Sequence, residues 1–324
     1  MKASPLDGEQ ALRLLATMWR IRLFEERVGQ LKRADDVHGL VHLSTGQEGV
    51  AAAVCSQLRD DDPVYSGHRA HGHAIAKGAP LDRLMAELMG RDGGLCRGLG
   101  GSMHVVDVEH GFMGATGVVG GNIPIALGSA LAARRLGRDS VAVVFFGDGA
   151  VQAGQFNETV NLATLWRLPL ILVCENNGFA EFTPRSAHTN VERVSDVVAP
   201  YDVERDTVDG NDVVAVWDAF GRYLASARGG RGPFLLECLT YRLGGHYEGD
   251  PGKYREALAA ADWQAKDPIL RLQRHGIAQG WFAADVLPAL ESEAAEAVEQ
   301  AVRFGRESPF PPVELIEAMV YADA

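Results

Sequence analysis

Several features that define other protein classes are missing from this sequence of 324 residues. No run approaches the ~18 uninterrupted apolar residues that a membrane helix needs, and the first residues contain no apolar core of a secretion signal. The four cysteines, Cys55, Cys96, Cys174 and Cys238, form no C-x-x-C pair. We therefore expect neither export nor membrane insertion, and we interpret the cysteines as reduced residues of a cytoplasmic protein.

Positive charge is in the minority, and it is not clustered. Lys and Arg total 31 against 43 Asp and Glu, which gives a formal net charge of −12. The absence of a basic block argues against a nucleic acid or an anionic membrane as a partner. Internal repeats, low-complexity stretches and a credible linker are also missing, so we predict one domain over residues 1–324 with a C-terminal helical tail.

The most informative stretch is a predicted strand, helix and strand between residues 141 and 179. Residues 141–146 and 170–174 are continuous apolar runs, typical of parallel strands covered on both faces. A helix between them is predicted from apolar residues at helical spacing: Phe156, Val160, Ala163, Leu165 and Trp166. The pattern favours an α/β fold in which helices flank a mostly parallel sheet in three layers.

The two strand ends carry the first candidate ligands. Asp148 lies between two glycines after the first strand, and Asn177 follows the second. Parallel strands end at the same edge of a sheet, where ligands of such sheets bind. One carboxylate, one amide oxygen and a backbone carbonyl just downstream would make a partial cage for Mg²⁺, which in turn would hold a diphosphate. Each turn alone is typical of an ordinary connection, but together they favour a metal site.

Gly147-Asp148-Gly149 followed by Asn176-Asn177 resembles the thiamine-diphosphate-binding motif. The surrounding residues resemble the α subunit of the E1 component of 2-oxo acid and acetoin dehydrogenase complexes, and the resemblance spans nearly the whole chain. It implies the thiamine-diphosphate-binding fold. It also implies that Mg²⁺ is bound by Asp148, Asn177 and the carbonyl of Phe179, that the diphosphate lies against Gly147, Gly149 and Ala150, and that the aminopyrimidine ring meets backbone at Gly117 and Val119.

Upstream of this unit, residues 8–31 predict a long amphipathic helix whose charged face we expect to be solvated, although in the family this helix also helps docking between subunits. A second helix is predicted over 49–58, with Ser44 or Thr45 as its cap. His42 lies in the loop before it. A histidine in such a loop is more often structural, but the family's HL-x-x-GQE motif places it at the substrate side of the cofactor.

A short strand starting at Val64 ends in a run, residues 66–73, with three histidines and one arginine. We reject a zinc site, because neighbouring loop positions do not set tetrahedral geometry and no Cys/His pairing is present. Arginine suits phosphate instead. The family resemblance implies that His68 and Arg69 contact the diphosphate and that His71 faces the active-site channel.

Two glycine-containing segments follow. Residues 90–101, GRDGGLCRGLGG, predict a loop; a phosphate cradle is an alternative, but neither a P-loop nor a dinucleotide fingerprint is present. Residues 112–122 lead into a small-residue helix over 123–134. Its small residues permit close packing of another backbone or simple packing on the sheet, and the family uses helices of this region at subunit contacts.

In the second half, residues 182–196 predict a loop across the active-site edge, followed by a strand over 203–208, a helix over 213–227 and a strand over 234–241. His246 lies in the glycine-rich loop after that strand, a position suited to proton transfer. The family's G-H-x-x-x-D-P loop orders over bound cofactor, and its histidine reaches the substrate. Residues 257–304 read as helical, with a last short helix after Pro312.

The resemblance implies the α subunit of an E1 enzyme that works with Mg²⁺ and thiamine diphosphate in an α2β2 heterotetramer. The cofactor's carbanion attacks acetoin or a 2-oxo acid, and the acyl group passes to a lipoyl group on E2. The segment 68–73 and the His246 loop are most similar to the acetoin branch, whereas Ser44 stands where many acetoin-type relatives have an aromatic residue. Pyruvate, branched-chain and biosynthetic acyl-transferring relatives, and a non-catalytic partner-binding subunit, remain alternatives; a Rossmann oxidoreductase is disfavoured.

Overall fold

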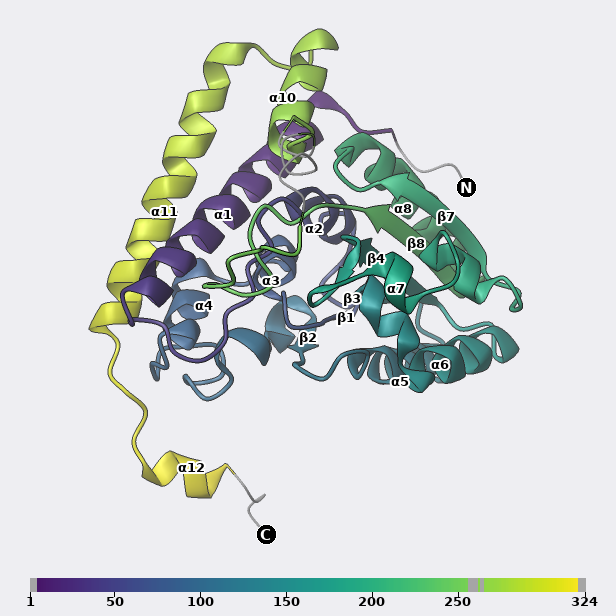
Figure 1. Cartoon of the computed structure of the whole chain (residues 1–324), viewed down its shortest axis with the longest axis horizontal. Coiled ribbons are helices and arrows are strands. Elements are labelled where there is room, and N and C mark those ends of the chain that lie inside the picture. Colours follow the sequence, from purple (N-terminus) through teal and green to yellow (C-terminus); the bar gives the residue numbers. More distant parts are fainter. Residues whose placement is uncertain (1–4, 256–261, 263–264, 320–324) are drawn as a thin grey trace.

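A six-stranded parallel sheet forms the centre of the molecule (Figure 1). The computed structural model describes residues 5–255, 262 and 265–319. All neighbouring strands of the sheet are parallel. In sheet order they are β2 (Phe112–Ala115), β1 (Val64–Ser66), β3 (Ala142–Gly147), β4 (Leu170–Asn176), β8 (Phe234–Leu239) and β7 (Glu204–Asp209). The predicted α/β class and the parallel sheet are confirmed.

Both faces of the central strands β3, β4 and β8 are buried, which explains the continuous apolar runs in the sequence. In β3, Val143 and Phe145 belong to one core cluster, and Val144 and Phe146 belong to the other. Successive side chains of a strand point to opposite faces of the sheet. When both faces are covered by helices, every position of the strand is buried, so apolar and polar residues do not alternate.

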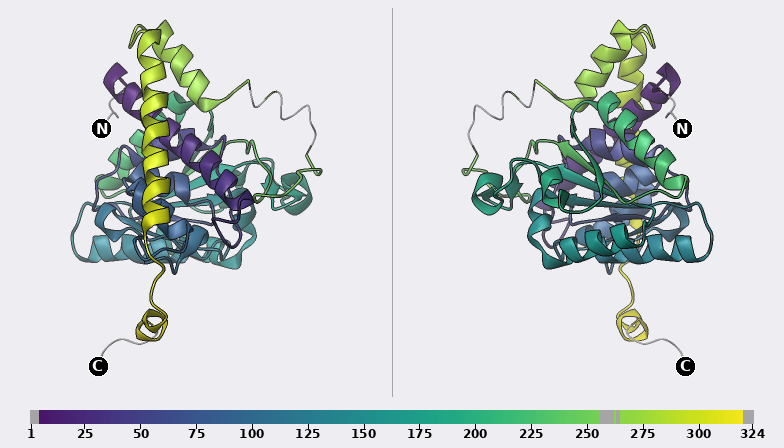
Figure 2. Two further views of the ribbon diagram at one scale, coloured as in Figure 1. Left: turned by 90° about the vertical axis from the view of Figure 1, so that its left-hand side faces the viewer. Right: turned by 90° about the vertical axis from the view of Figure 1, so that its right-hand side faces the viewer.

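The helices complete three layers (Figures 1 and 2). One layer shares the larger core cluster and contains α1 (Gly8–Arg33), α2 (Glu48–Cys55), α3 (His71–Lys77), α4 (Leu81–Leu88), α8 (Val213–Arg228), α10 (Pro268–Ala278) and α11 (Leu287–Glu307). The opposite layer packs in the second cluster and contains α5 (Asn122–Arg135) and α6 (Gly154–Leu165). The helix predicted between the two central strands is therefore α6, and it joins β3 to β4.

Two details of the predicted helices are wrong. Leu165 and Trp166 do not continue the buried stripe of α6; both are exposed, because the helix ends at Leu165 and the chain turns there. Neither Ser44 nor Thr45 caps α2, whose cap position is Gln47 and carries no side-chain hydrogen bond. The Ser44 hydroxyl instead donates to Glu25, at 2.6 Å.

The segment over 182–196 is more structured than a plain loop. It holds the strand β6 (Thr183–Pro184), which pairs antiparallel with β5 (Phe179–Ala180), and the short helix α7 (Arg185–His188). Five short 3₁₀ turns also occur, η1 (Gly101–Met103), η2 (Val108–His110), η3 (Asp148–Gln152), η4 (Val194–Val198) and η5 (Ala284–Val286). As a result, α7 is brought against η3 at the sheet's carboxyl edge.

At the C-terminal end, α10 begins at the predicted Asp267-Pro268 cap, and α11 packs along α1 and α4. Part of the helical pattern predicted from Ala257 onward falls at 256–261 and 263–264, outside the described residues. After α11 the chain leaves the body and forms α12 (Glu314–Ala318), which projects away from it (Figure 2). The Arg91 guanidinium lies 3.8 Å over the Phe310 ring and anchors the start of this arm.

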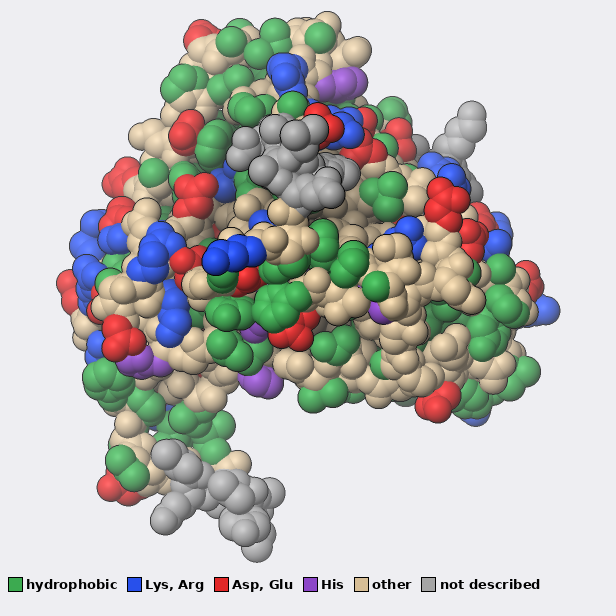
Figure 3. All heavy atoms as spheres, viewed as in Figure 1, with side chains coloured by type: hydrophobic (Ala, Val, Ile, Leu, Met, Phe, Trp, Pro, Cys, Tyr) green, Lys and Arg blue, Asp and Glu red, His purple; other side chains and the backbone are tan. Residues whose placement is uncertain are grey.

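The surface carries mixed charge. On the face seen in Figure 3, acidic and basic side chains are interspersed. Among the described residues, no helix combines the length and the apolar character needed to cross a membrane. All four cysteines are free, and Cys55, Cys174 and Cys238 are buried.

Candidate active site at the carboxyl edge of the sheet

A pocket of about 490 Å³ lies at the carboxyl edge of the sheet. It is lined by the turns after β1, β3 and β4 and by the loop after β8. From β1 the chain first adds β2 on one side and then adds β3 on the other side of β1. The order of the strands therefore changes direction between β1 and β3, next to the pocket. Crevices of this kind are where open parallel sheets bind ligands, and the volume is within the range of about 300–1,000 Å³ found for ligand sites.

Asp148 begins η3 directly after β3. Its side chain is completely buried, with 0% exposure, and neither carboxylate oxygen has a hydrogen-bond partner in the structure. Burial raises the pKa of the Asp148 carboxyl, because a buried anion is unfavourable, and the nearby backbone N–H groups of Asp148 and Asn177 and the His188 side chain offset this only in part. Buried polar atoms are almost always paired in proteins, so two unpaired oxygens on one side chain point to a missing positive ligand.

The two asparagines after β4 have separate roles. Asn176 is buried and belongs to the framework: its amide donates to Glu237 at 2.7 Å and its side-chain oxygen accepts from the Gly178 N–H at 3.0 Å. Asn177 lines the pocket, and its side-chain oxygen makes only a long contact of 3.3 Å with the Phe179 N–H. The structure therefore leaves Asn177, not Asn176, available to a ligand.

Backbone around Asp148 approaches the pocket closely. Gly147, Gly149, Ala150, Gly117 and Val119 all lie in its lining. At Gly149 an added Cβ would meet the Cβ of Ala180 at 2.7 Å, so only glycine lets β5 come this close. At Gly147 nothing lies within 4 Å of such a Cβ, and a side chain there would take up pocket space.

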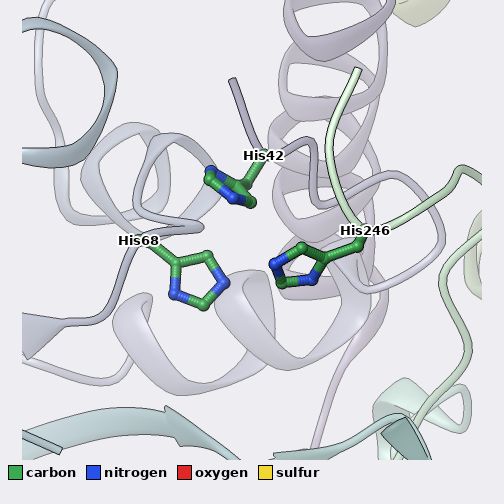
Figure 4. A group of neighbouring side chains, drawn as sticks. All are labelled: His42, His68 and His246. Atoms are coloured by element: carbon green, nitrogen blue, oxygen red, sulfur yellow. The ribbon is translucent and has the colours of Figure 1, made fainter. Parts of the chain in front are cut away.

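Three histidines from distant parts of the sequence meet in the pocket (Figure 4). The ring centroids of His42 and His68 are 4.6 Å apart, and those of His42 and His246 are 4.9 Å apart. Burial, with Arg69 nearby, lowers the pKa of His42 to about 3, of His68 to about 2 and of His246 to about 4. At neutral pH all three imidazoles are therefore uncharged.

Two arginines determine which nitrogen of His246 carries its proton. A guanidinium nitrogen of Arg69 lies 3.2 Å from His246 Nδ1, and one of Arg242 lies 3.3 Å from the same atom. Arginine can only donate, so Nδ1 accepts and the proton of neutral His246 is on Nε2. His246 thus offers an N–H donor, whereas the sequence suggested a group that titrates near neutral pH.

The same arginines decide what kind of ligand the histidines suit. One ligand atom from each of His42, His68 and His246 lies within 4.8 Å of the others, which is close enough to suggest a metal ion. Arg69 and Arg242 stand beside His246, however, and make this end of the pocket positive. Positive charge and N–H donors favour an anionic ligand over a cation.

His71 is not where the sequence placed it. It opens α3, is completely buried and does not line the pocket. Its Nδ1 lies 2.9 Å from a Glu25 carboxylate oxygen and its Nε2 lies 2.9 Å from the Ser102 hydroxyl. The expectation that His71 faces the active-site channel is therefore corrected, because both of its ring nitrogens bond to buried side chains of the core.

The charged face of the first helix also needs correction. Arg22 and Glu25 of α1 are buried, because α2 and α3 pack over that face. Arg22 pairs with Glu48 and with Asp267, and Glu25 accepts hydrogen bonds from the backbone N–H and hydroxyl of Ser44. Helical periodicity predicted the charged face of this helix, but it could not predict that α2 and α3 cover that face.

The glycine-rich loop over 90–101 is not a phosphate cradle. The buried Glu87 carboxylate, at the end of α4, accepts from four backbone N–H groups of this loop, those of Cys96, Gly98, Gly100 and Gly101, at 2.7–3.0 Å. These four donors are thus occupied by a carboxylate of the chain itself. Residues 90–101 do not line the pocket, although the nearby Met103 does.

Three further residues of the pocket region were not singled out from the sequence. His73 Nε2 lies 3.3 Å from Glu175, and its ring stacks on Phe145 at 3.9 Å. Arg242 contacts His246, as described above. His188 of α7 lies with Nε2 3.7 Å from an Asp148 carboxylate oxygen. Arg242 follows a predicted strand and could have been noticed there, but His188 lies in an aperiodic stretch with no signal of its own.

Comparison with known proteins is consistent across the chain. The family model described as "Dehydrogenase E1 component" matches residues 16–314. The α subunit of acetoin:2,6-dichlorophenolindophenol oxidoreductase from Bacillus subtilis is 42% identical over 94% of this chain and 92% of its own length, and that from Cupriavidus necator is 42% identical over 98% and 96%. The pyruvate dehydrogenase E1 component subunit alpha of Rhizobium meliloti is 38% identical over 94% of this chain and 88% of its own.

Proposed function

Because this chain belongs to the dehydrogenase E1 component family, we propose that it is the α subunit of a thiamine-diphosphate-dependent E1 enzyme. The enzyme cleaves acetoin or decarboxylates a 2-oxo acid and transfers the acyl group to a lipoyl-bearing E2. The observation that carries the proposal is the buried Asp148 carboxylate, unpaired at the end of β3 beside a pocket of about 490 Å³.

The residues at this edge fit a metal-bound diphosphate. Asp148, Asn177 and the backbone carbonyl of Phe179 would hold Mg²⁺, since carboxylate, amide and carbonyl oxygens are the ligands it prefers. The diphosphate would lie against Gly147, Gly149 and Ala150, where only small residues leave room.

Arg69 and His68 would also contact the diphosphate, and Gly117 and Val119 would meet the aminopyrimidine ring. Thiamine diphosphate, when bound, supplies an electron sink for cleaving a carbon bond next to a carbonyl.

The chain's own contribution is to orient ligands and hold protons. His246 presents Nε2–H to the pocket, so it would donate a hydrogen bond to a substrate or cofactor oxygen. His42 is neutral, and its Nδ1 is buried without a partner, which suits an atom kept for a ligand. His71 does not line the pocket, so it would affect a ligand there only through Glu25 and Ser102, as a positioning residue.

We favour acetoin as the substrate. The two acetoin relatives share 42% of their residues with this chain and the pyruvate relative shares 38%. Pyruvate, branched-chain and biosynthetic relatives are the alternatives in the same class. Ser44, whose hydroxyl is bonded to Glu25, leaves the pocket without the aromatic residue of many acetoin-type relatives.

The partner we propose is an E1 β subunit, in an α2β2 heterotetramer of the cytoplasm. The name "subunit alpha" carried by the relatives supports a second kind of chain. One face of α5, with Ile125 58% exposed, Gly128, Ala132 and Leu136 64% exposed, presents small and apolar residues to solvent. Such a face suits close packing of another subunit.

Calorimetric titration of thiamine diphosphate with Mg²⁺ tests the proposal, using this chain co-expressed with its β-type partner. We expect magnesium-dependent binding that Asp148→Ala abolishes. Asp206→Ala is the matched control, because Asp206 pairs with Arg222 on the surface. If the intact pair binds nothing, a non-catalytic partner-binding subunit becomes the better conclusion.

A further inference from the structure

We propose that His188 is a further ligand of the cation held by Asp148, so that this site accepts metals that bind imidazole, such as Co²⁺, in addition to Mg²⁺. The inference rests on the proposed function, since it adds a residue to the same cation site. It concerns which metals the site binds, because a site with oxygen ligands alone favours hard cations such as Mg²⁺.

Three buried polar atoms without partners meet at this point. They are the two carboxylate oxygens of Asp148 and Nε2 of His188, each lacking a hydrogen bond in the structure. The His188 side chain is only 13% exposed. A single orphaned atom is sometimes tolerated, but three atoms of complementary ligand type on two facing side chains indicate one shared ligand.

The separation of these side chains is too long for a direct hydrogen bond and too short for a bridging water. His188 Nε2 lies 3.7 Å from the nearer Asp148 oxygen. A charge-assisted hydrogen bond would need about 2.7–2.9 Å. A bridging water, with two bonds of about 2.8 Å at a tetrahedral angle, would separate the two atoms by roughly 4.5 Å. Metal bonds of about 2.0–2.2 Å to nitrogen and oxygen place two ligands roughly 3.0 Å apart at a right angle and roughly 3.4 Å apart at a tetrahedral angle, so His188 would move by a few tenths of an ångström toward Asp148 when both bind one ion.

His188 is also held in position from behind. Its Nδ1 lies 2.9 Å from the Thr189 hydroxyl, and that hydroxyl accepts a hydrogen bond from the Gln152 side chain at 2.8 Å. When Nδ1–H donates to Thr189, Nε2 keeps the lone pair that a metal requires. Metal-binding histidines have this arrangement, in which the second ring nitrogen is bonded to a neighbouring oxygen and fixes the tautomer.

The segment that carries His188 is attached to the rest of the site. The Arg185 N–H at the start of α7 donates to the Gly178 carbonyl at 2.8 Å, so α7 is tied to the turn that follows Asn177. The segments η3, β5 and α7, which carry or adjoin the proposed ligands, therefore contact one another.

Cobalt binding to the full chain tests this inference without relying on activity. Co²⁺ is titrated into the wild type and variants, with and without thiamine diphosphate, and its visible absorption and affinity are measured; Mg²⁺ affinity follows from displacement. We expect His188→Ala to weaken Co²⁺ binding by about 10–100-fold, to change its absorption spectrum, and to alter Mg²⁺ binding by less than about threefold. His188→Gln, which keeps a polar side chain in α7, should behave in the same way.

Two controls separate the possible failures. His42→Ala should leave the cobalt spectrum unchanged, because the histidine cluster is a different part of the pocket. Asp148→Ala should abolish both metals; if it does not, the proposed cation site itself is wrong. If Asp148→Ala acts as expected but His188→Ala and His188→Gln leave cobalt binding intact, or weaken Co²⁺ and Mg²⁺ by the same factor, His188 is not a ligand and only this inference fails.

Discussion

Glu25 illustrates how a single charged side chain is used inside this protein. It is completely buried, and it accepts hydrogen bonds from Ser44 and contacts His71 at 2.9 Å. Burial alone would raise the pKa of the Glu25 carboxyl, but the neighbouring His71 and the bonds from Ser44 outweigh it and keep the pKa below its usual value. Glu25 thus connects α1 to α3 and to the loop of His42.

Glu25→Ala should strongly destabilise the fold. It leaves the donors of Ser44 and His71 buried without an acceptor, and each buried polar group left unpaired costs about 1–3 kcal/mol. Glu9→Ala, on the same helix but in an exposed pair with Arg13, should cost less than about 1 kcal/mol. The free energy of unfolding in urea is the measurement. Equal losses in the two variants would contradict the role given to Glu25.

At the scale of an element, the loop over 90–101 folds around one carboxylate. Its glycines are required by close contacts and not by a ligand: at Gly98, where φ is +76°, an added Cβ would lie 2.4 Å from the Gly90 carbonyl carbon. The backbone N–H groups that this shape turns inward all meet Glu87. The glycine-rich composition predicted a loop, and only the structure shows that its backbone N–H groups bind a carboxylate of the chain itself.

Glu87→Ala should loosen this loop without unfolding the rest. Four N–H groups would lose their acceptor, and hydrogen bonds to a charged group contribute about 1.5–3 kcal/mol each at most. Limited trypsin digestion should then cleave faster after Arg91 or Arg97, by about tenfold or more. Asp82→Ala, in the exposed first turn of the same helix, is the control. Unchanged cleavage in Glu87→Ala would show that the loop is held by other contacts.

At the scale of the whole molecule, the α5 face is apolar but has no covering element among the described residues. A Cβ added at Gly128 meets nothing within 4 Å. Val118 and Val119, in the turn before α5, are also exposed. On the proposed function the chain would hold only the diphosphate half of the cofactor site, and the family resemblance implies that the glutamate that activates the cofactor comes from the β subunit. We therefore expect the chain purified alone to show no turnover.

Ile125→Asp should prevent assembly with the β-type partner, because a charge would be buried in an apolar contact. Light scattering after size-exclusion chromatography of the co-expressed pair should change from a complex to separate chains. Ile277→Asp, at an exposed isoleucine of α10, should leave the complex intact. A complex that survives Ile125→Asp would place the subunit contact elsewhere.

The sequence by itself determined the framework of this protein. Continuous apolar runs required strands covered on both faces. Asp212 caps the start of one helix and Asp267-Pro268 starts another, and the order of elements placed Asp148 and Asn177 at one edge. These features depend on periodicity and on the order of elements along the chain, and both can be read from a single sequence. The assignment of ligands to those residues rests on the family resemblance and on the proposal above.

Only the tertiary structure decided which side chains share an environment. It moved His71 into the core with Glu25, joined His42, His68 and His246 around two arginines, and brought His188 to Asp148. Glu25 and His71 are 46 positions apart in the sequence, and Arg69 and His246 are 177 positions apart, so their contacts depend on packing and on the exclusion of water. Burial and pairing of that kind arise when elements pack, so no local pattern in the chain encodes them.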